Sequence, residues 1–430
     1  MSSPGTVGAP ASSSAQGQMD KEKQRQLYLY GAVGACLIGI PMLVTMPGLF
    51  EALTTLLYKM FQLVCFFAFL TIGALWWYQE KLLFHPEMPP GLKLPEQNPD
   101  GMKTPGEHDI PYEDVYATTS DGVRIHMWMM WQKKEEQTGG GQPLPTIIFF
   151  QGNAGNMGLR LPFFVDVYRQ LKCHILAVSY RGYGHSSGIP TEEGIYLDSE
   201  AALDWLNQRV VSRLTAEGGE GSDRQGGGQR RRVAAEADVA AEADAAPTTS
   251  AARVMSRAPG SLALGRLISW KDESLSPACL SKVFVMGRSL GGAVAIRLAR
   301  QMPYEIRGVI VENTFTSIEH MVEILFPFLR PFKILFPLIQ RLQLTSIEHV
   351  KNCRTPILFL SGQQDELVPA EQMETLHRES ASVLKKIHRV KQGSHNDTWR
   401  QGGTAYWQAI ADFIASCLAL SVSSDSPDRT

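Results

Sequence analysis

The fold of this 430-residue chain can be approached from ten of its residues, Val283-Phe284-Val285-Met286-Gly287-Arg288-Ser289-Leu290-Gly291-Gly292. The apolar run that opens this stretch has the length of a buried strand, and the small residues that follow are typical of a tightly packed helix start. Between the two lies a G-x-S-x-G pattern, whose glycines permit a sharp turn because a Cβ there would strike the neighbouring strand or helix. The pattern predicts a nucleophile elbow with Ser289 at its tip. The alternative is a serine in an ordinary Gly-rich turn.

Similar apolar runs recur on both sides of this stretch, and amphipathic segments separate them. Continuous apolar runs suit strands that are buried on both faces of a parallel sheet. Strands that alternate with helices are typical of a doubly wound fold, so we predict an α/β protein with a doubly wound, mostly parallel sheet. Around the turn Asp121-Gly122, apolar and polar residues alternate, which predicts a β-hairpin ahead of the other strands. The other predicted strands are Thr146–Phe150, Ile175–Ser179, Val309–Val311, Ile357–Leu360 and Ile387–Val390.

A serine nucleophile needs a base and an acidic residue that orients the base. After a G-x-S-x-G elbow, the expected chain order is Ser, then Asp or Glu, then His. Asp365 follows the predicted strand Ile357–Leu360, at the carboxyl-end edge where the active sites of open α/β sheets lie. Its neighbour Glu366 is the rival. The offset of Asp365 from the strand favours Asp365 as the acidic residue.

The predicted general base is His395. Of the ten histidines, it is the one that follows Asp365 and also lies just after a predicted strand. His377 falls on a predicted helix and His388 inside a strand, where a structural role is more common.

An oxyanion hole requires two N–H donors, and each stabilises the transition state by about 3 kcal/mol. The first predicted donor is the backbone N–H of Leu290, which follows the nucleophile. The second is expected in the loop after an early strand, where Gln151-Gly152-Asn153-Ala154-Gly155-Asn156 follows an apolar run. We assign it to the backbone N–H of Asn153. The alternative is an ordinary Gly/Asn turn.

The region 27–78 predicts a membrane anchor, because only Glu51 and Lys59 carry charge in it. It is longer than the apolar core of a cleaved signal peptide, which is the alternative. Trp76-Trp77-Tyr78 is typical of an interfacial aromatic belt. Two uncharged stretches, Leu27–Phe50 and Phe61–Tyr78, leave one or two crossings open. Basic residues ahead of them favour a cytoplasmic N-terminus, so one crossing places the rest of the chain outside the cytosol and two return it there.

The rest of the chain divides by composition. We expect flexible tails at 1–26 and 419–430, a connector at 79–111 and one globular domain at 112–418. Within that domain, about 217–259 is of low complexity and predicts a disordered insertion, because so few apolar residues cannot offset the entropy of ordering. The apolar, Pro-rich segment at about 318–345 predicts a cap-like segment, and the alternative is a pair of core helices.

Composition excludes several classes of protein. With 41 Lys plus Arg against 43 Asp plus Glu, the formal charge of -2 indicates no nucleic-acid partner. The six cysteines form no C-x-x-C pair and no cluster with histidine, so the sequence predicts neither a metal site nor a disulfide scaffold. No cofactor is predicted.

The chain resembles the α/β-hydrolase superfamily and, within it, a membrane-anchored subgroup that includes the bud-emergence-type homologues of fungi and plants. The resemblance implies a serine hydrolase with Ser289 as nucleophile, Asp365 as acid and His395 as base, and one N-terminal anchor in a type II orientation. The long insertion after Arg209 departs from the subgroup. The residues that carry the resemblance are Gln151 to Asn156, Tyr180-Arg181-Gly182-Tyr183-Gly184, Gly287 to Gly292, Val311-Glu312-Asn313-Thr314-Phe315 and Ser394-His395-Asn396-Asp397-Thr398-Trp399.

These observations predict a membrane-anchored serine hydrolase that cleaves an ester, thioester or amide through an acyl-enzyme. The apolar cap-like segment beside a membrane favours acyl chains, so the expected substrates are a small acyl or lipid ester or an acylated protein. The alternative is a membrane scaffold that keeps the fold while its chemistry is idle.

Overall fold

The computed structural model describes residues 23–25, 28–30, 47–133, 144–220 and 282–424. The chain divides into two compact units, Met1–Trp77 and Tyr78–Thr430. The second unit contains the sheet and the predicted active-site residues, and it is called the sheet unit below.

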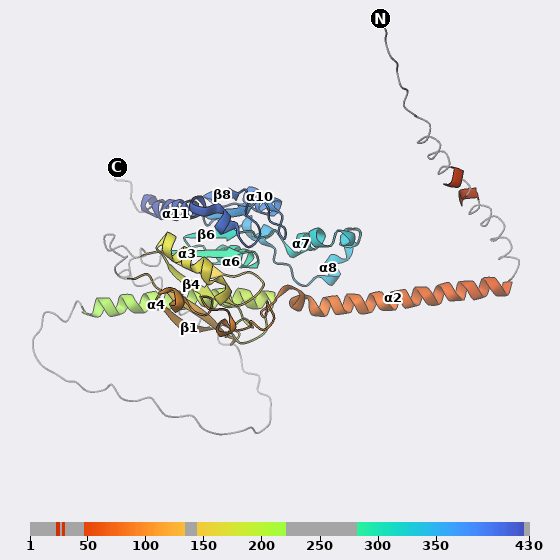
Figure 1. Cartoon of the computed structure of the whole chain (residues 1–430), viewed down its shortest axis with the longest axis horizontal. Coiled ribbons are helices and arrows are strands. Elements are labelled where there is room, and N and C mark those ends of the chain that lie inside the picture. Colours follow the sequence, from red (N-terminus) through yellow and green to blue (C-terminus); the bar gives the residue numbers. More distant parts are fainter. Residues whose placement is uncertain (1–22, 26–27, 31–46, 134–143, 221–281, 425–430) are drawn as a thin grey trace, which may run out of the picture. The chain divides into compact units, whose positions relative to one another are not determined.

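Eight strands of the sheet unit form one sheet in the order β1-β2-β4-β3-β5-β6-β7-β8 (Figure 1). β2 pairs antiparallel with both β1 and β4, and all other neighbours are parallel. The doubly wound, mostly parallel sheet predicted from the apolar runs is confirmed. The strands are β1 Tyr112–Thr118, β2 Arg124–Met130, β3 Thr146–Phe150, β4 His174–Val178, β5 Val283–Arg288, β6 Gly308–Glu312, β7 Ile357–Gly362 and β8 Lys385–Val390.

Helices cover both faces of the sheet (Figure 1). Successive residues of β3 alternate between the two cores, since Ile148 and Phe150 belong to one and Ile147 and Phe149 to the other. Both faces are therefore buried, which is why the strands appear in the sequence as continuous apolar runs. α3 (Leu161–Leu171) and α11 (Thr398–Ser424) pack on one face, and α4 (Glu192–Glu220), α6 (Leu290–Gln301) and α10 (Ala370–Glu379) on the other.

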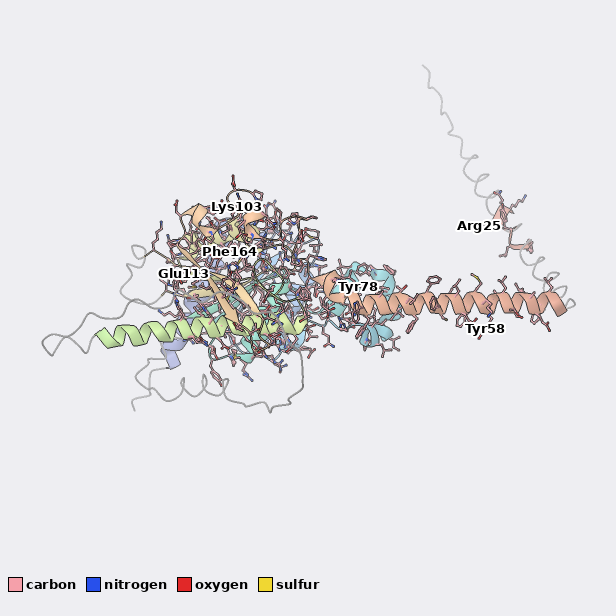
Figure 2. The ribbon with its side chains drawn as sticks, turned by 90° about the horizontal axis from the view of Figure 1, so that it is seen from below. Arg25, Tyr58, Tyr78, Lys103, Glu113 and Phe164 are labelled. Carbon is pink, nitrogen blue, oxygen red and sulfur yellow. The ribbon has the colours of Figure 1, made fainter. Side chains whose placement is uncertain are left out.

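The predicted anchor lies in one long helix, α2 (Pro47–Leu83), of which Gly48–Leu83 is long and apolar enough to cross a membrane. Figure 2 shows Tyr58 projecting from this helix. The second predicted stretch, Phe61–Tyr78, falls within α2. Most of the first, Leu27–Phe50, lies outside the described residues, so the number of crossings stays a prediction.

Short helices replace regular structure in the Pro-rich segments. The connector forms the 3-10 helices η1 (Pro95–Gln97) and η2 (Pro105–His108), and η4 (Met157–Arg160) precedes α3. The chain after β6 forms α7 (Ile318–Leu325), the 3-10 helix η5 (Pro327–Leu335), α8 (Phe336–Ile339) and α9 (Ser346–Val350). Proline at 327 and 331 cannot donate backbone hydrogen bonds, so these turns do not merge into one long helix.

The low-complexity insertion falls almost entirely outside the described residues, which resume at Lys282. Its predicted start at about 217 lies inside α4, which continues to Glu220.

Candidate active site

Ser289 forms the turn between β5 and α6, and its backbone has φ 53° and ψ -119°. A residue with a side chain rarely adopts this region, and holding it there costs about 1–3 kcal/mol. The backbone N–H of Ser289 donates to the Glu312 carbonyl at 2.9 Å, and the Thr314 hydroxyl donates to the Ser289 carbonyl at 2.7 Å. The Ser289 side chain makes no capping hydrogen bond to α6. The turn is therefore anchored by its backbone, and the hydroxyl is not used to hold the helix.

The glycines of the G-x-S-x-G pattern are required by close backbone approach. A Cβ on Gly287 would lie 2.0 Å from the Gly291 carbonyl oxygen, and a Cβ on Gly291 would lie 2.0 Å from the Phe150 carbonyl oxygen. The second distance shows that the elbow packs closely against the end of β3, where the predicted oxyanion loop begins. A Cβ on Gly152 would lie 3.8 Å from the Ser289 Cβ, so this loop lies beside Ser289.

Asp365 and His395 are in direct contact. The ring Nδ1 of His395 lies 2.7 Å from Oδ2 of Asp365, and both side chains are buried. The other carboxylate oxygen of Asp365 accepts the backbone N–H groups of Leu367 at 2.9 Å and Val368 at 2.7 Å, which fixes the carboxylate. Glu366 is exposed, and within the described part of the chain its carboxylate accepts only the backbone N–H of His395, at 3.4 Å. The geometry thus favours Asp365 over its rival as the partner of the imidazole.

Ser289, Asp365 and His395 follow β5, β7 and β8, so they lie at the same carboxyl-end edge of the parallel strands. The structure brings the imidazole and the carboxylate together. Among the described residues, no hydrogen bond joins the Ser289 hydroxyl to the His395 ring. Catalytic hydrogen bonds of this kind are often long in structures without ligand and tighten when substrate binds.

Asn313, directly after β6, holds the histidine loop in place. Its backbone has φ 47°, and its side-chain amide donates to the Ser394 carbonyl at 3.0 Å, the His395 carbonyl at 3.2 Å and the Thr398 hydroxyl at 2.9 Å. Its amide oxygen accepts the N–H of Gly362 at the end of β7, at 2.8 Å. Asn313 was not among the predicted site residues. An asparagine immediately after a buried strand, where a left-handed turn is needed, was the available signal.

The predicted oxyanion loop is held by residues at the end of α2. The side-chain amide of Asn153 donates to the Leu83 carbonyl at 3.0 Å, and the Asn153 carbonyl accepts the His85 N–H at 2.8 Å and the Tyr183 hydroxyl at 2.7 Å. His85 also forms a parallel bridge with Ala154. These contacts occupy the Asn153 side chain and carbonyl but not its backbone N–H. The other predicted donor, Leu290, is the first residue of α6, where backbone N–H groups have no partner within the helix.

A buried ion pair lies next to Ser289. The guanidinium Nε of Arg288 lies 2.6 Å from a carboxylate oxygen of Glu312, and both side chains are buried. These two residues face each other in the register of β5 and β6. The Tyr406 hydroxyl donates to the other Glu312 oxygen, and burial together with this carboxylate raises the pKa of Tyr406 well above its usual range. The pair therefore connects the residue before Ser289 to the residue whose carbonyl accepts the Ser289 N–H.

We expect Glu312→Gln to lower the free energy of unfolding of the sheet unit by about 3–5 kcal/mol, because it leaves the Arg288 charge buried without a partner. Arg288→Met should lower the free energy of unfolding by a similar amount, because it leaves the Glu312 carboxylate buried without its cationic partner. The double variant Arg288→Met/Glu312→Leu should recover most of the loss, because both charges are gone. Denaturant unfolding of the detergent-solubilised chain measures all three. A double variant that loses the sum of the two single losses would contradict this account.

Comparison with known proteins gives consistent matches. A family model described as an alpha/beta hydrolase domain matches residues 266–419. Alpha/beta hydrolase domain-containing protein WAV2 of Arabidopsis thaliana is 32% identical over 347 residues, which cover 78% of this chain and 87% of that protein. Protein bem46 of Schizosaccharomyces pombe is 30% identical over 346 residues, covering 80% and 89%. A protein of Saccharomyces cerevisiae named uncharacterized membrane protein YNL320W is 29% identical over 345 residues, covering 80% and 92%.

Proposed function

Since the chain belongs to the α/β-hydrolase family, we propose that it is a membrane-anchored serine hydrolase that cleaves an ester, thioester or amide through an acyl-enzyme. The observation that carries the proposal is the strained Ser289 turn at the same sheet edge as the buried Asp365–His395 pair. The φ 53° and ψ -119° of Ser289 are a strained combination of the kind that clusters at active sites, and a buried imidazole–carboxylate pair is what a general base requires.

In the proposed reaction, the Ser289 Oγ attacks the carbonyl carbon of the substrate while Nε2 of His395 takes the hydroxyl proton. Asp365 holds Nδ1–H of the ring, so that Nε2 is the basic nitrogen, and stabilises the imidazolium that forms. The backbone N–H groups of Leu290 and Asn153 stabilise the oxyanion. Collapse of the tetrahedral intermediate transfers the proton from His395 to the leaving group and leaves an acyl group on Ser289. Water, activated by the same imidazole, then releases the acid.

We propose an acylated substrate, either a lipid or acyl ester or an acylated protein. Two features support this choice: the apolar helices α7, η5 and α8 that follow β6, and the helix α2 that is apolar and long enough to cross a membrane. Neither feature distinguishes the two substrate sources. A panel of acylglycerols and acyl peptides, presented to the purified full-length chain, separates them by relative kcat/KM.

A fluorophosphonate probe tests the nucleophile without a known substrate, because it reacts with an activated serine and loses fluoride to form a stable adduct. We expect the wild-type chain to be labelled and Ser289→Ala to be unlabelled. Ser382→Ala is the matched control, since Ser382 precedes β8 at the opposite edge of the sheet and should leave labelling unchanged. A folded wild-type chain that never reacts would identify the protein as an idle scaffold.

A further inference from the structure

The segment between α7 and α8 exposes an unusual amount of apolar surface. Six large apolar side chains, here called the cap surface, are between 46% and 85% exposed: Leu325, Phe326, Phe328, Phe332, Ile334 and Leu338. They fall within one stretch of η5 and its flanking helix ends. Soluble proteins rarely gather large apolar side chains in this way unless the surface binds something.

Basic side chains accompany this surface. Arg330 and Lys333 are exposed within η5, and Lys333 pairs with Glu319 at 3.1 Å and Glu323 at 2.5 Å on α7. Aromatic and aliphatic side chains interspersed with Arg and Lys are typical of segments that lie in the interfacial layer of a bilayer.

The end of α2 holds this segment at its carboxyl-terminal side. The side-chain amide of Gln79 donates to the Ile339 carbonyl at 2.7 Å, and its oxygen accepts the N–H of Arg341 at 2.8 Å and of Leu342 at 3.2 Å. The next residue, Glu80, forms an ion pair with Arg341. Figure 2 labels Tyr78, the residue that precedes this contact along the chain. The cap surface is therefore fastened to the last turns of the helix predicted to cross the membrane.

The sequence of α2 indicates where the bilayer ends. Twenty residues without charge separate Lys59 from Glu80. At a rise of 1.5 Å per residue they span about 30 Å, which equals the thickness of the hydrocarbon core. Gln79 and Glu80 then mark the interface, just after the aromatic belt that ends at Tyr78. Whatever is hydrogen-bonded to these two residues lies at the surface of the membrane.

We propose that the cap surface docks into the interfacial layer of the bilayer that α2 crosses. The inference rests on the membrane anchoring in the proposed function and deepens it, because docking holds the segment after β6 against the lipid from which an acylated substrate would come. The bilayer is favoured over a second copy or a partner protein because the attachment through Gln79 and Glu80 brings it to the lipid surface in every chain. A protein partner, by contrast, would first have to reach the cap surface by diffusion.

A solvent-sensitive NBD label tests the docking directly and needs no catalytic activity. The full-length chain, with Cys36, Cys65 and Cys279 changed to serine, carries the label through Phe332→Cys and is reconstituted in phosphatidylcholine vesicles. The matched control is the label at Tyr304→Cys, because Tyr304 is 92% exposed and lies between α6 and β6, at the opposite edge of the sheet. We expect lipids with a nitroxide on the acyl chain to quench the label at 332 and leave the label at 304 bright.

The outcomes separate the possible occupants. A label at 332 that stays unquenched overturns the proposal. Energy transfer between labelled chains without lipid quenching also overturns it and assigns the surface to a second copy. Because the readout is optical, a chain that fails to react with a fluorophosphonate loses the proposed enzymatic function but still reports on docking.

A catalytic experiment adds the functional consequence. Phe328→Ser/Phe332→Ser should lower kcat/KM for a lipid ester embedded in vesicles about tenfold, which corresponds to about 1.4 kcal/mol of docking free energy. Hydrolysis of a soluble acetyl ester and fluorophosphonate labelling should stay unchanged, because neither requires contact with lipid. Tyr304→Ser is the control for loss of an exposed ring. An equal loss on soluble and vesicle substrates would show that the pair supports the fold or the site instead of docking.

Discussion

Ser289→Ala is expected to lower kcat about 10⁶-fold on any ester that the wild-type chain hydrolyses, because no other group can form the acyl-enzyme. His395→Ala should cost about as much, since the hydroxyl without its base is a poor nucleophile. The two residues act as a unit, so the double variant Ser289→Ala/His395→Ala should be no slower than either single variant.

The measurement is turnover of a p-nitrophenyl ester by chains purified in parallel, with thermal unfolding to confirm that each variant is folded. Ser382→Ala again serves as the control and should retain wild-type kcat. Losses that multiply in the double variant would show that the two side chains act independently, which is incompatible with an elbow serine activated by this imidazole.

Asp365→Asn is expected to lower kcat about 10⁴-fold while the fold is retained. An asparagine oxygen can still accept the backbone N–H groups of Leu367 and Val368, so the loop keeps its shape. Its amide nitrogen, however, donates toward Nδ1 of His395, which places the ring proton on Nε2. A protonated Nε2 cannot take the hydroxyl proton of Ser289.

The control is Glu366→Gln, which removes the neighbouring charge from an exposed side chain that does not reach the imidazole. It should change kcat by less than about threefold, as expected for a surface substitution. The rate constant for fluorophosphonate labelling gives a second readout that is independent of substrate choice. A larger loss for Glu366→Gln than for Asp365→Asn would exchange the roles of the two carboxylates.

The sheet was predictable because its strands are covered on both faces. Strands such as β5 and β7 then consist of consecutive apolar residues, which a sequence displays without any knowledge of their neighbours. The Ser289 turn was predictable for a related reason. A Cβ on Gly287 or Gly291 would lie 2.0 Å from a backbone oxygen, so local sterics restrict these positions to glycine and the turn can be recognised from the residue types.

Contacts made by backbone groups were not predictable. On the side of α2, the hydrogen bonds to the Asn153 loop use the backbone carbonyl of Leu83 and the backbone N–H of His85, which are groups that nearly every residue carries, and they span some seventy positions. The Arg288–Glu312 pair was hidden for another reason. Arg288 occupies an unrestricted position of the G-x-S-x-G pattern, and its partner is known only once β5 and β6 are placed in register. The hydrogen bonds of Asn313 were hidden for the same reason, because they follow from which strands lie side by side.

The contact between the end of α2 and the Asn153 loop determines where a truncated chain should begin. Phe84 is buried in the core, and its neighbours Leu83 and His85 contact the loop through a hydrogen bond and an isolated parallel bridge. A fragment that starts at β1 lacks these contacts, whereas one that starts at Tyr78 keeps them. The last turns of α2 therefore hold the loop that carries the predicted oxyanion donor Asn153, and a truncated chain needs them to keep that loop in place.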